Sequence, residues 1–296
     1  MDIKHIGPAN PGWDFIGEVS GIDLTQPISP AEVDAIEAGM DRYGVLVFHN
    51  QHITDEQQVA FSVNFGDLEA TLANVTKPED RRLKLNIADI SNLDKNNQVL
   101  AADDKRRMFN LGNMLWHSDS SFKATPAKYS LLSGRAVPKA GGDTQFADMR
   151  AAYDAFPADI QTLIEPLITE HSLIYSRGQL GFEAFDAEER RAFAPVLQRL
   201  VRTHPVTGRK SVFLSSHIGV IRGMLTPEAR MRIRDLTEMA TQPRFVHTHR
   251  WQAGDLVIWD NRTTMHRARR YNDTGEVRDM RRTTIEGAPT VMQQAA

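Results

Sequence analysis

The chain has 296 residues, of which 41% are hydrophobic and 25% are charged, as in globular proteins with a substantial buried core. It contains no cysteine, which excludes disulfides, zinc sites built on thiolates and thiol nucleophiles. The formal net charge of -3 gives no field suited to nucleic acid, and the N-terminal stretch has no apolar signal segment. We therefore expect a cytoplasmic protein with no nucleic-acid partner and no membrane span.

The first predicted helix covers residues 29–44. It begins with Ser29, Pro30 and Glu32, a pattern typical of helix starts, and continues with apolar residues at helical spacing. The apolar run "GVLVFHN" (44–50) that follows predicts a buried strand.

Two further helices are predicted. In residues 54–66, Thr54 and Gln57 occupy the positions of a capping box before an apolar face. Residues 226–240 have helical spacing, with Thr226 as the predicted cap and a proline at the first helical position.

Residues 67–112 are polar and irregular, and we predict that they form a mobile flap over a site. Short β-rich runs separated by turn segments such as "PVTGRK" predict strands at 128–137, 143–149, 200–205, 211–216, 245–251, 255–261 and 280–287. Many short strands with helices outside them predict a mainly β fold, either a sandwich or a jelly roll. No repeat or linker divides the chain, so we expect one domain over 1–296.

Candidate metal ligands occur in "LWHSDSSF" (115–122), which we interpret as extended chain. Side chains two residues apart on a strand point to the same face, so His117 and Asp119 would face one ion together. Alone, such a pair is more often a polar pair at a strand edge. His266, just after the run 255–261, is the candidate third ligand, and two imidazoles with one carboxylate are typical of Fe(II) sites that react with oxygen.

Two arginines follow His266 in "RDMRRTT". Arg278 and Arg282 are four residues apart, so on a strand they would share a face. A buried guanidinium needs a partner, and arginine forms bidentate pairs with carboxylates. If both face inward, they imply an anionic ligand beside the candidate metal site.

Together these segments resemble a known family. "LWHSDSSF", "GGDTQFADMRAAYDAF", "HPVTGRK", "GDLVIWDNRTTMHRARRY" and "RDMRRTT" are similar, in order and spacing, to segments of the Fe(II)/2-oxoglutarate dioxygenases of the taurine dioxygenase superfamily. The similarity is greatest to the 2,4-dichlorophenoxyacetate (aryloxyalkanoate) dioxygenase branch and covers nearly the whole chain. It implies a double-stranded β-helix core (jelly roll, cupin-like) with flanking helices.

The resemblance also implies roles for individual residues. His117, Asp119 and His266 would hold Fe(II), and Thr144 and Arg278 would bind the distal carboxylate of the cosubstrate 2-oxoglutarate. O2 would be the second cosubstrate. No other catalytic residue is implied beyond the iron centre.

For the substrate, the resemblance implies a small anionic molecule whose acidic group is held by Arg282, with Asn92 and His217 in the same pocket. Hydroxylation of the carbon beside the carboxylate of an aryloxyalkanoate would release a phenol and glyoxylate, with succinate and CO2 as coproducts. A homo-oligomer is expected, as is common in this superfamily.

Two alternatives use the same scaffold. A taurine, sulfonate or small-carboxylate dioxygenase would have the same iron site and a different pocket. A catalytically inactive jelly-roll binding protein would keep the barrel without turnover, although the presence of every ligand weighs against it. A zinc hydrolase is disfavoured because the chain has no His-Glu-x-x-His motif.

Overall fold

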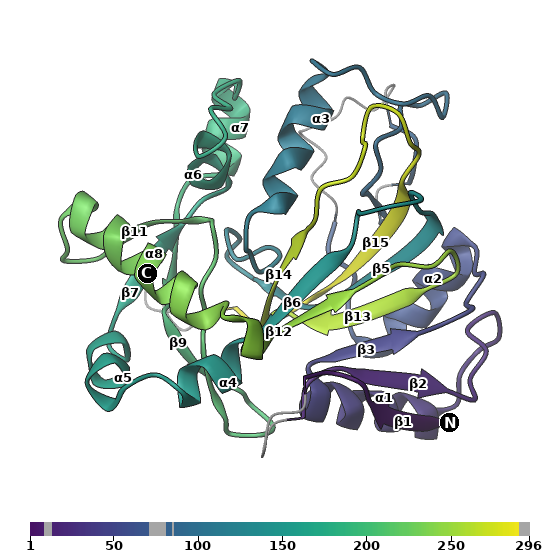
Figure 1. The fold of residues 1–296 in the computed structure, drawn as a ribbon, viewed down its shortest axis with the longest axis horizontal. Helices are drawn as coiled ribbons and strands as arrows, with labels where there is room; N and C mark the ends of the chain where they lie inside the picture. Colours follow the sequence, from purple (N-terminus) through teal and green to yellow (C-terminus); the bar gives the residue numbers. More distant parts are fainter. Residues whose placement is uncertain (9–13, 71–80, 85, 290–296) are drawn as a thin grey trace.

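The computed structural model describes residues 1–8, 14–70, 81–84 and 86–289 (Figure 1). Its strands are β1 (Asp2–His5), β2 (Gly17–Ser20), β3 (Val45–Phe48), β4 (Ala88–Asp89), β5 (Ala127–Ala136), β6 (Thr144–Asp148), β7 (Ile168–His171), β8 (Val196–Arg199), β9 (Val201–Thr203), β10 (Lys210–Val212), β11 (Ile218–Ile221), β12 (Val246–His249), β13 (Leu256–Asp260), β14 (Thr264–Ala268) and β15 (Asp279–Glu286). The α-helices are α1 (Pro30–Tyr43), α2 (Asp55–Ser62), α3 (Lys105–Asn110), α4 (Met149–Asp154), α5 (Ala158–Ile164), α6 (Leu173–Gly178), α7 (Ala187–Ala192) and α8 (Thr226–Ala240), and the 3-10 turns are η1 (Val63–Phe65), η3 (Leu111–Met114) and η4 (Pro243–Phe245). Of the helices described, none has the length and apolar character that a membrane crossing requires.

The described strands form one large sheet in the order β1-β2-β3-β13-β5-β15-β4 and a small sheet β12-β6-β14. Strands β11-β7-β8 and β10-β9 form two further small sheets. In the large sheet β2 pairs with β3 in parallel, whereas β13, β5 and β15 pair antiparallel. The large sheet and β12-β6-β14 meet at the centre of the molecule, and α5 and α8 lie to one side (Figure 1).

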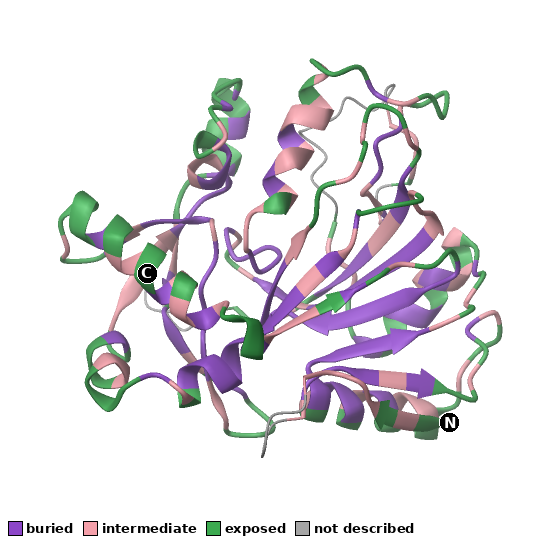
Figure 2. Cartoon of the chain, viewed as in Figure 1, coloured by how far each residue is buried: buried purple, intermediate pink, exposed green. Residues whose placement is uncertain are grey.

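The large sheet is buried on both faces, because its apolar residues alternate between two cores (Figure 2). On β3, Val45 and Val47 pack with Phe146 of β6, in the core between the two sheets. Leu46 and Phe48 point the other way, into a core shared with helices α1 and α2. The fold is therefore a mixed arrangement of sheets and helices, with more helix than the mainly β fold that the sequence predicts.

The predicted N-terminal helices are confirmed by α1 and α2. The hydroxyl of Ser29 accepts from the main-chain N–H of Glu32, and the main-chain N–H of Ser29 donates to the Glu32 carboxylate. Thr54 and Gln57 form the same reciprocal pair. The second helix is shorter than expected, since α2 ends at Ser62 and continues as the 3-10 turn η1.

The prediction for the cap of α8 is wrong. Leu225 has the extended backbone of an N-cap residue, and Thr226 is already helical. The physical reason is that the first helical hydrogen bond runs from the N–H of Ala229 to the carbonyl of Leu225, so the helix begins one residue before the proline. No side chain caps this end.

Each of the strands predicted within 128–287 overlaps an observed one: β5, β6, β9, β10, β12, β13 and β15. The run 200–205 contains only the short strand β9, because Leu200 separates it from β8, which pairs with β7 in a different sheet. The "PVTGRK" hairpin is confirmed, since Thr203 of β9 pairs with Lys210 of β10.

Residues 115–122 do not form the predicted strand. Only His117 makes a β-bridge, and the chain then turns, with Ser120 at a φ of 54°. The predicted flap, where it is described, contains β4, α3 and η3. Arg82 ties it to the large sheet through ion pairs with Asp89 and with Asp279 of β15. Residues 71–80 of the flap prediction lie outside the described residues.

Candidate active site

Two imidazoles are held side by side by a reciprocal main-chain bridge. The N–H of His117 donates to the carbonyl of His266 at 3.0 Å, and the N–H of His266 donates back at 2.9 Å. His266 lies on β14, and the centroid of its ring is 4.6 Å from that of Trp259. The centroids of the two imidazoles are 4.2 Å apart. The bridge therefore fixes both rings on one side of the small sheet.

Asp119 reaches the same point through a turn and a network of polar side chains. Its N–H donates to Oδ1 of Asn261 at 3.0 Å, and Ser130 donates to its Oδ2 at 2.7 Å. Nδ2 of Asn261 in turn donates to Ser130 at 2.9 Å. Nη1 of Arg282 donates to Oδ1 of Asp119 at 2.5 Å. The carboxylate is thus positioned without the extended strand that the sequence predicts.

The three side chains form the group of potential metal ligands found among the described residues, with ligand atoms within 4.8 Å of one another. Nε2 of His117 lies 3.8 Å from Oδ1 of Asp119, and Nε2 of His266 lies 3.7 Å from Oδ2. The Nδ1 of His117 donates to the carbonyl of Leu115 at 2.7 Å, which leaves the lone pair of Nε2 directed toward the carboxylate.

The protonation states also suit a divalent cation. Burial lowers the pKa of both His117 and His266, so both imidazoles are neutral and able to coordinate. Burial opposes ionisation of Asp119, but the charge of Arg282, together with the hydrogen bond from Ser130, holds its pKa below the ordinary value. Two neutral imidazoles and one carboxylate fit Fe(II), and the described residues add no thiolate or second carboxylate.

A cavity of about 350 Å³, here called the strand-side cavity, opens on one side of this group. It is lined by Thr144 of β6, by Trp259 and His266, and by both Arg278 and Arg282. Arg278 precedes β15 instead of lying within it, yet it faces the same cavity as Arg282, as predicted.

Arg278 is buried, with 5% of its surface exposed. Among the described residues it has no ion pair with a carboxylate, and its Nη atoms reach only the carbonyls of Ile90 and Gly142, at 3.4 and 3.3 Å. Burial accordingly lowers its pKa. The hydroxyl of Thr144 accepts from Nε1 of Trp251 at 2.9 Å, so its own proton is free to be donated. This end of the cavity is built for an anion.

Asn92 lines the strand-side cavity, but its amide is occupied by the main chain. Nδ2 donates to the carbonyls of Asp273 and Glu276 at 2.8 and 2.7 Å, and Oδ1 accepts from the N–H of Arg278 at 2.8 Å. The predicted contact with substrate is therefore not supported by a free polar atom. The amide instead holds the loop that carries Arg278.

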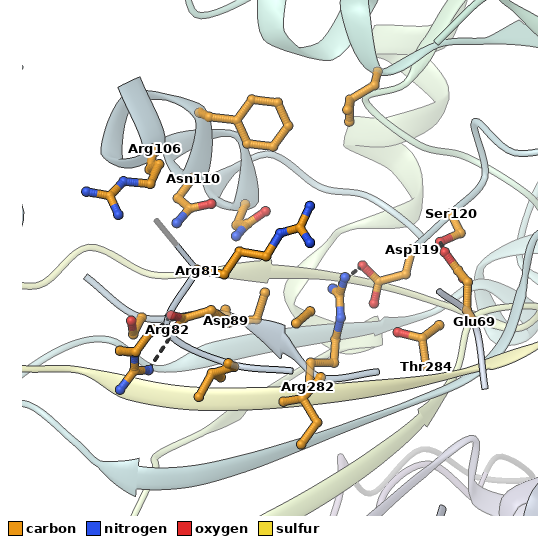
Figure 3. Close-up of a pocket in the computed structure, with 18 of the residues that line it drawn as sticks. Glu69, Arg81, Arg82, Asp89, Arg106, Asn110, Asp119, Ser120, Arg282 and Thr284 are labelled. Carbon is orange, nitrogen blue, oxygen red and sulfur yellow. Dashed lines mark hydrogen bonds and ion pairs between the residues drawn. The ribbon is translucent and has the colours of Figure 1, made fainter. Parts of the chain in front are cut away.

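A second cavity, of about 210 Å³ and here called the helix-side cavity, adjoins the first. Both are lined by His117 and Arg282, and only the second is lined by Asp119 and His217. Arg282 rises from the sheet to Asp119, and Arg81 extends across the space beside it (Figure 3). Most of the other lining comes from helices and irregular segments.

His217 lies in the helix-side cavity as predicted. Its ring centroid is 6.1 Å from that of His117 and 4.8 Å from that of Phe122. Burial lowers its pKa well below the ordinary value, so the ring is neutral. Its Nδ1 is hydrogen-bonded to the hydroxyl of Ser176 at 2.9 Å, which leaves Nε2 available for a hydrogen bond to a ligand.

Sequence analysis missed several residues of this site. Ser130 and Asn261 support Asp119, and Arg177 and Phe109 line the helix-side cavity. Sequence patterns indicate at most the helix, strand or turn in which each of these residues lies. They do not indicate its contacts, because the residues that it contacts are distant in the sequence. An arginine with no nearby carboxylate in the chain carries no signal before the fold is known.

The comparisons with known proteins agree with this geometry. The family model described as "Taurine catabolism dioxygenase TauD, TfdA family" matches residues 2–284. The chain belongs to that family. It is 44% identical, over 92% of each chain, to the alpha-ketoglutarate-dependent 2,4-dichlorophenoxyacetate dioxygenase of Burkholderia sp. (strain RASC).

Two further relatives are similar over most of their length. The (S)-phenoxypropionate/alpha-ketoglutarate-dioxygenase of Sphingobium herbicidovorans is 36% identical, over 93% of each chain. The crystal structure of AAD-2 in complex with Mn(II) and N-oxalylglycine is 55% identical and superposes with a TM-score of 0.94, covering 98% of this chain and 99% of that one. This member of the TauD/TfdA family is therefore an alpha-ketoglutarate (2-oxoglutarate)-dependent dioxygenase with a small-molecule substrate.

Proposed function

We propose that the protein hydroxylates the carbon beside the carboxylate of an aryloxyalkanoate such as 2,4-dichlorophenoxyacetate, using Fe(II), 2-oxoglutarate and O2. The observation that carries this proposal is the buried group of His117, Asp119 and His266, which lies between two cavities. Each cavity is lined by a buried arginine, Arg278 or Arg177, that has no ion pair with a carboxylate of the described residues. The names of the 2,4-dichlorophenoxyacetate and phenoxypropionate relatives supply the substrate class.

In this proposal His117, Asp119 and His266 hold the metal. Bound Fe(II), together with 2-oxoglutarate and O2, supplies an oxidant able to hydroxylate a C–H bond, with succinate and CO2 as coproducts. The contribution of the chain is to keep both imidazoles neutral, to orient the carboxylate through Ser130, and to bury the centre.

Arg278 and Thr144 would bind the distal carboxylate of 2-oxoglutarate. The guanidinium supplies charge and paired donors in a buried wall, and the hydroxyl adds one donor, since its acceptor lone pair already serves Trp251. The carboxylate would replace the solvation that Arg278 loses on burial.

Arg282 would hold the substrate carboxylate close to the metal, because its guanidinium already touches Asp119. The carbon bonded to that carboxylate is then the nearest to the oxidant. Its hydroxylation in an aryloxyacetate gives a hemiacetal, and collapse of the hemiacetal breaks the bond to the aryl oxygen. The products are the phenol and glyoxylate.

We also propose that residues 1–296 form one domain around a double-stranded β-helix (jelly roll). The family match over residues 2–284 and the apolar core between the large sheet and β12-β6-β14 support this assignment. The segment 67–112 would then cover the cavities, since Ile90, Asn110 and other residues of it line both. Homo-oligomeric assembly and a cytoplasmic location stay predictions.

The test is a coupled assay. The purified protein is incubated with Fe(II), 2-oxoglutarate, ascorbate and air, and succinate and phenol are measured with phenoxyacetate and, separately, with taurine. We expect equal amounts of succinate and phenol with phenoxyacetate only. Succinate formation stimulated by taurine instead would assign a sulfonate substrate to the same iron site. Bound iron without succinate from either compound would refute the aryloxyalkanoate assignment.

A further inference from the structure

Arg177 is a buried cation to which the proposed reaction assigns no role. It lies on α6, lines the helix-side cavity, and exposes only 5% of its surface. Its Nε is buried and has no hydrogen-bond partner among the described residues. Because a buried N–H without a hydrogen-bond partner is energetically costly, this guanidinium indicates a binding site for a ligand that accepts from it.

The contacts around Arg177 are neutral. Nη1 donates to the hydroxyl of Ser176 at 3.2 Å, and the guanidinium stacks 4.3 Å from the ring centroid of Phe109. No carboxylate of the described residues forms an ion pair with it, whereas the equally buried Arg150 is paired with Asp148 at 3.0 Å. Burial lowers the pKa of Arg177 to about 10, which still leaves it charged near neutral pH.

The chain is shaped around this guanidinium. A Cβ atom placed on Gly112 of η3 would overlap it, so only glycine leaves the room that it occupies. Arg177 is also close to the metal ligands, because the neighbouring Ser176 bonds to His217 at 2.9 Å and the His217 ring is 6.1 Å from that of His117.

We propose that Arg177 binds the carboxylate of the substrate together with Arg282, an inference that rests on the proposed aryloxyalkanoate activity. Arg282 commits Nη1 to Asp119, so it cannot surround a second carboxylate alone. Arg177 supplies uncommitted donors in the same cavity. It also repeats the environment of Arg278, which is buried without an ion pair in the other cavity. Each cavity is thus lined by one fully buried arginine that has no ion pair among the described residues, Arg177 in one and Arg278 in the other.

The consequence is specificity for anionic aryl ethers over neutral ones. The test compares phenoxyacetate with its neutral analogue 2-phenoxyacetamide in the wild type, Arg177→Gln and Arg177→Lys. We expect Arg177→Gln to lower kcat/KM for the acid by about 10- to 100-fold, the effect of losing a charge-assisted hydrogen bond, and to change that for the amide much less. Arg177→Lys should recover part of the preference, and the KM for 2-oxoglutarate should not change.

Arg202 offers a matched control. It is half-buried, its guanidinium stacks 3.6 Å from the ring centroid of Phe213, and it lines neither cavity. Arg202→Gln should leave the ratio of acid to amide turnover at the wild-type value. Gly112→Ala, which displaces Arg177 without removing it, should lower that ratio.

Two results would overturn the inference: an equal loss on acid and amide in Arg177→Gln, or no loss on either. Calorimetric titration of phenoxyacetate into protein loaded with Mn(II) and N-oxalylglycine separates this failure from failure of the proposed function. Wild-type binding that is weakened in Arg177→Gln, without phenol formation by the wild type, would refute the activity and keep the role of Arg177. If the wild type forms phenol and Arg177→Gln forms it equally well, the proposed activity stands and the role of Arg177 is refuted.

Discussion

The two cavities place similar chemistry on different scaffolds. In the strand-side cavity, Thr144 and His266 lie on paired strands of the small sheet, where the main-chain ladder fixes them. In the helix-side cavity, Arg177 and Phe109 lie on short helices, and their positions depend on side-chain packing. We infer that cosubstrate binding belongs to the half built from strands and substrate choice to the half built from helices and loops, with the metal ligands between them.

The largest effect is expected from His266→Ala, because both cavities depend on the metal site between them. Loss of one imidazole should remove metal binding and lower succinate formation by about 10³-fold or more. Metal content by atomic absorption and turnover are measured together. His247→Ala, on β12 of the same small sheet and outside both cavities, is the control and should keep both metal content and turnover. A His266→Ala protein that binds metal as the wild type does would disprove the ligand assignment.

Arg278→Gln would sharpen the contrast between the halves. The neutral side chain cannot replace the bidentate charge, so the KM for 2-oxoglutarate should rise by about 100-fold while that for phenoxyacetate changes little. Arg281→Gln is the control, since Arg281 lies on β15, three residues after Arg278, and pairs with Asp55 at 2.6 Å, outside both cavities. If the KM for phenoxyacetate rose and the KM for 2-oxoglutarate did not, the strand-side cavity would bind the substrate and the helix-side cavity the cosubstrate.

The same division explains what the sequence predicts and what it does not. His117, Asp119, His266 and Arg278 are residue types whose spacing itself indicates a metal and an anion, whereas the role of Thr144 is implied by the family resemblance; the structure brings all five to one place. The prediction that His117 and Asp119 share one face of a strand is wrong, because a turn and not a strand positions Asp119.

The remaining residues depend on contacts across the fold. Ser130 and Asn261 are 131 positions apart, and each is an ordinary polar residue of a strand or turn until the fold joins them. The family resemblance predicts Asn92 in the substrate pocket. Its amide instead donates to the main-chain carbonyls of Asp273 and Glu276, more than 180 positions away. Spacing rules describe one element at a time, so they do not detect such pairs.

Ser130→Ala tests how far the support of Asp119 matters to the metal. Its hydroxyl donates to Oδ2 of Asp119, and outer partners of metal ligands typically contribute 10- to 100-fold in affinity, so we expect a loss of about that size in Mn(II) affinity. Ser133→Ala removes an equally buried hydroxyl from the same strand, but that hydroxyl bonds to Gln58 at 2.7 Å. If both variants weaken Mn(II) binding equally, the effect reports stability and not the support of Asp119.

The smallest effect is expected from Asn92→Ala, which separates the two halves at one residue. If the amide acts through the loop of Arg278, the KM for 2-oxoglutarate should rise by about tenfold, while kcat/KM for phenoxyacetate at saturating 2-oxoglutarate stays near the wild-type value. Asn64→Ala is the control, because Asn64 also donates to two main-chain carbonyls but lies outside both cavities.

The opposite pattern for Asn92→Ala, with the KM for phenoxyacetate raised and that for 2-oxoglutarate unchanged, would restore the sequence-based prediction that Asn92 contacts substrate. It would also mean that the amide exchanges its main-chain partners for the ligand when substrate binds. Equal changes in both constants would show that the loop holding Arg278 shapes both cavities at once. In that case Arg282, which lines both, would be the residue that transmits the change.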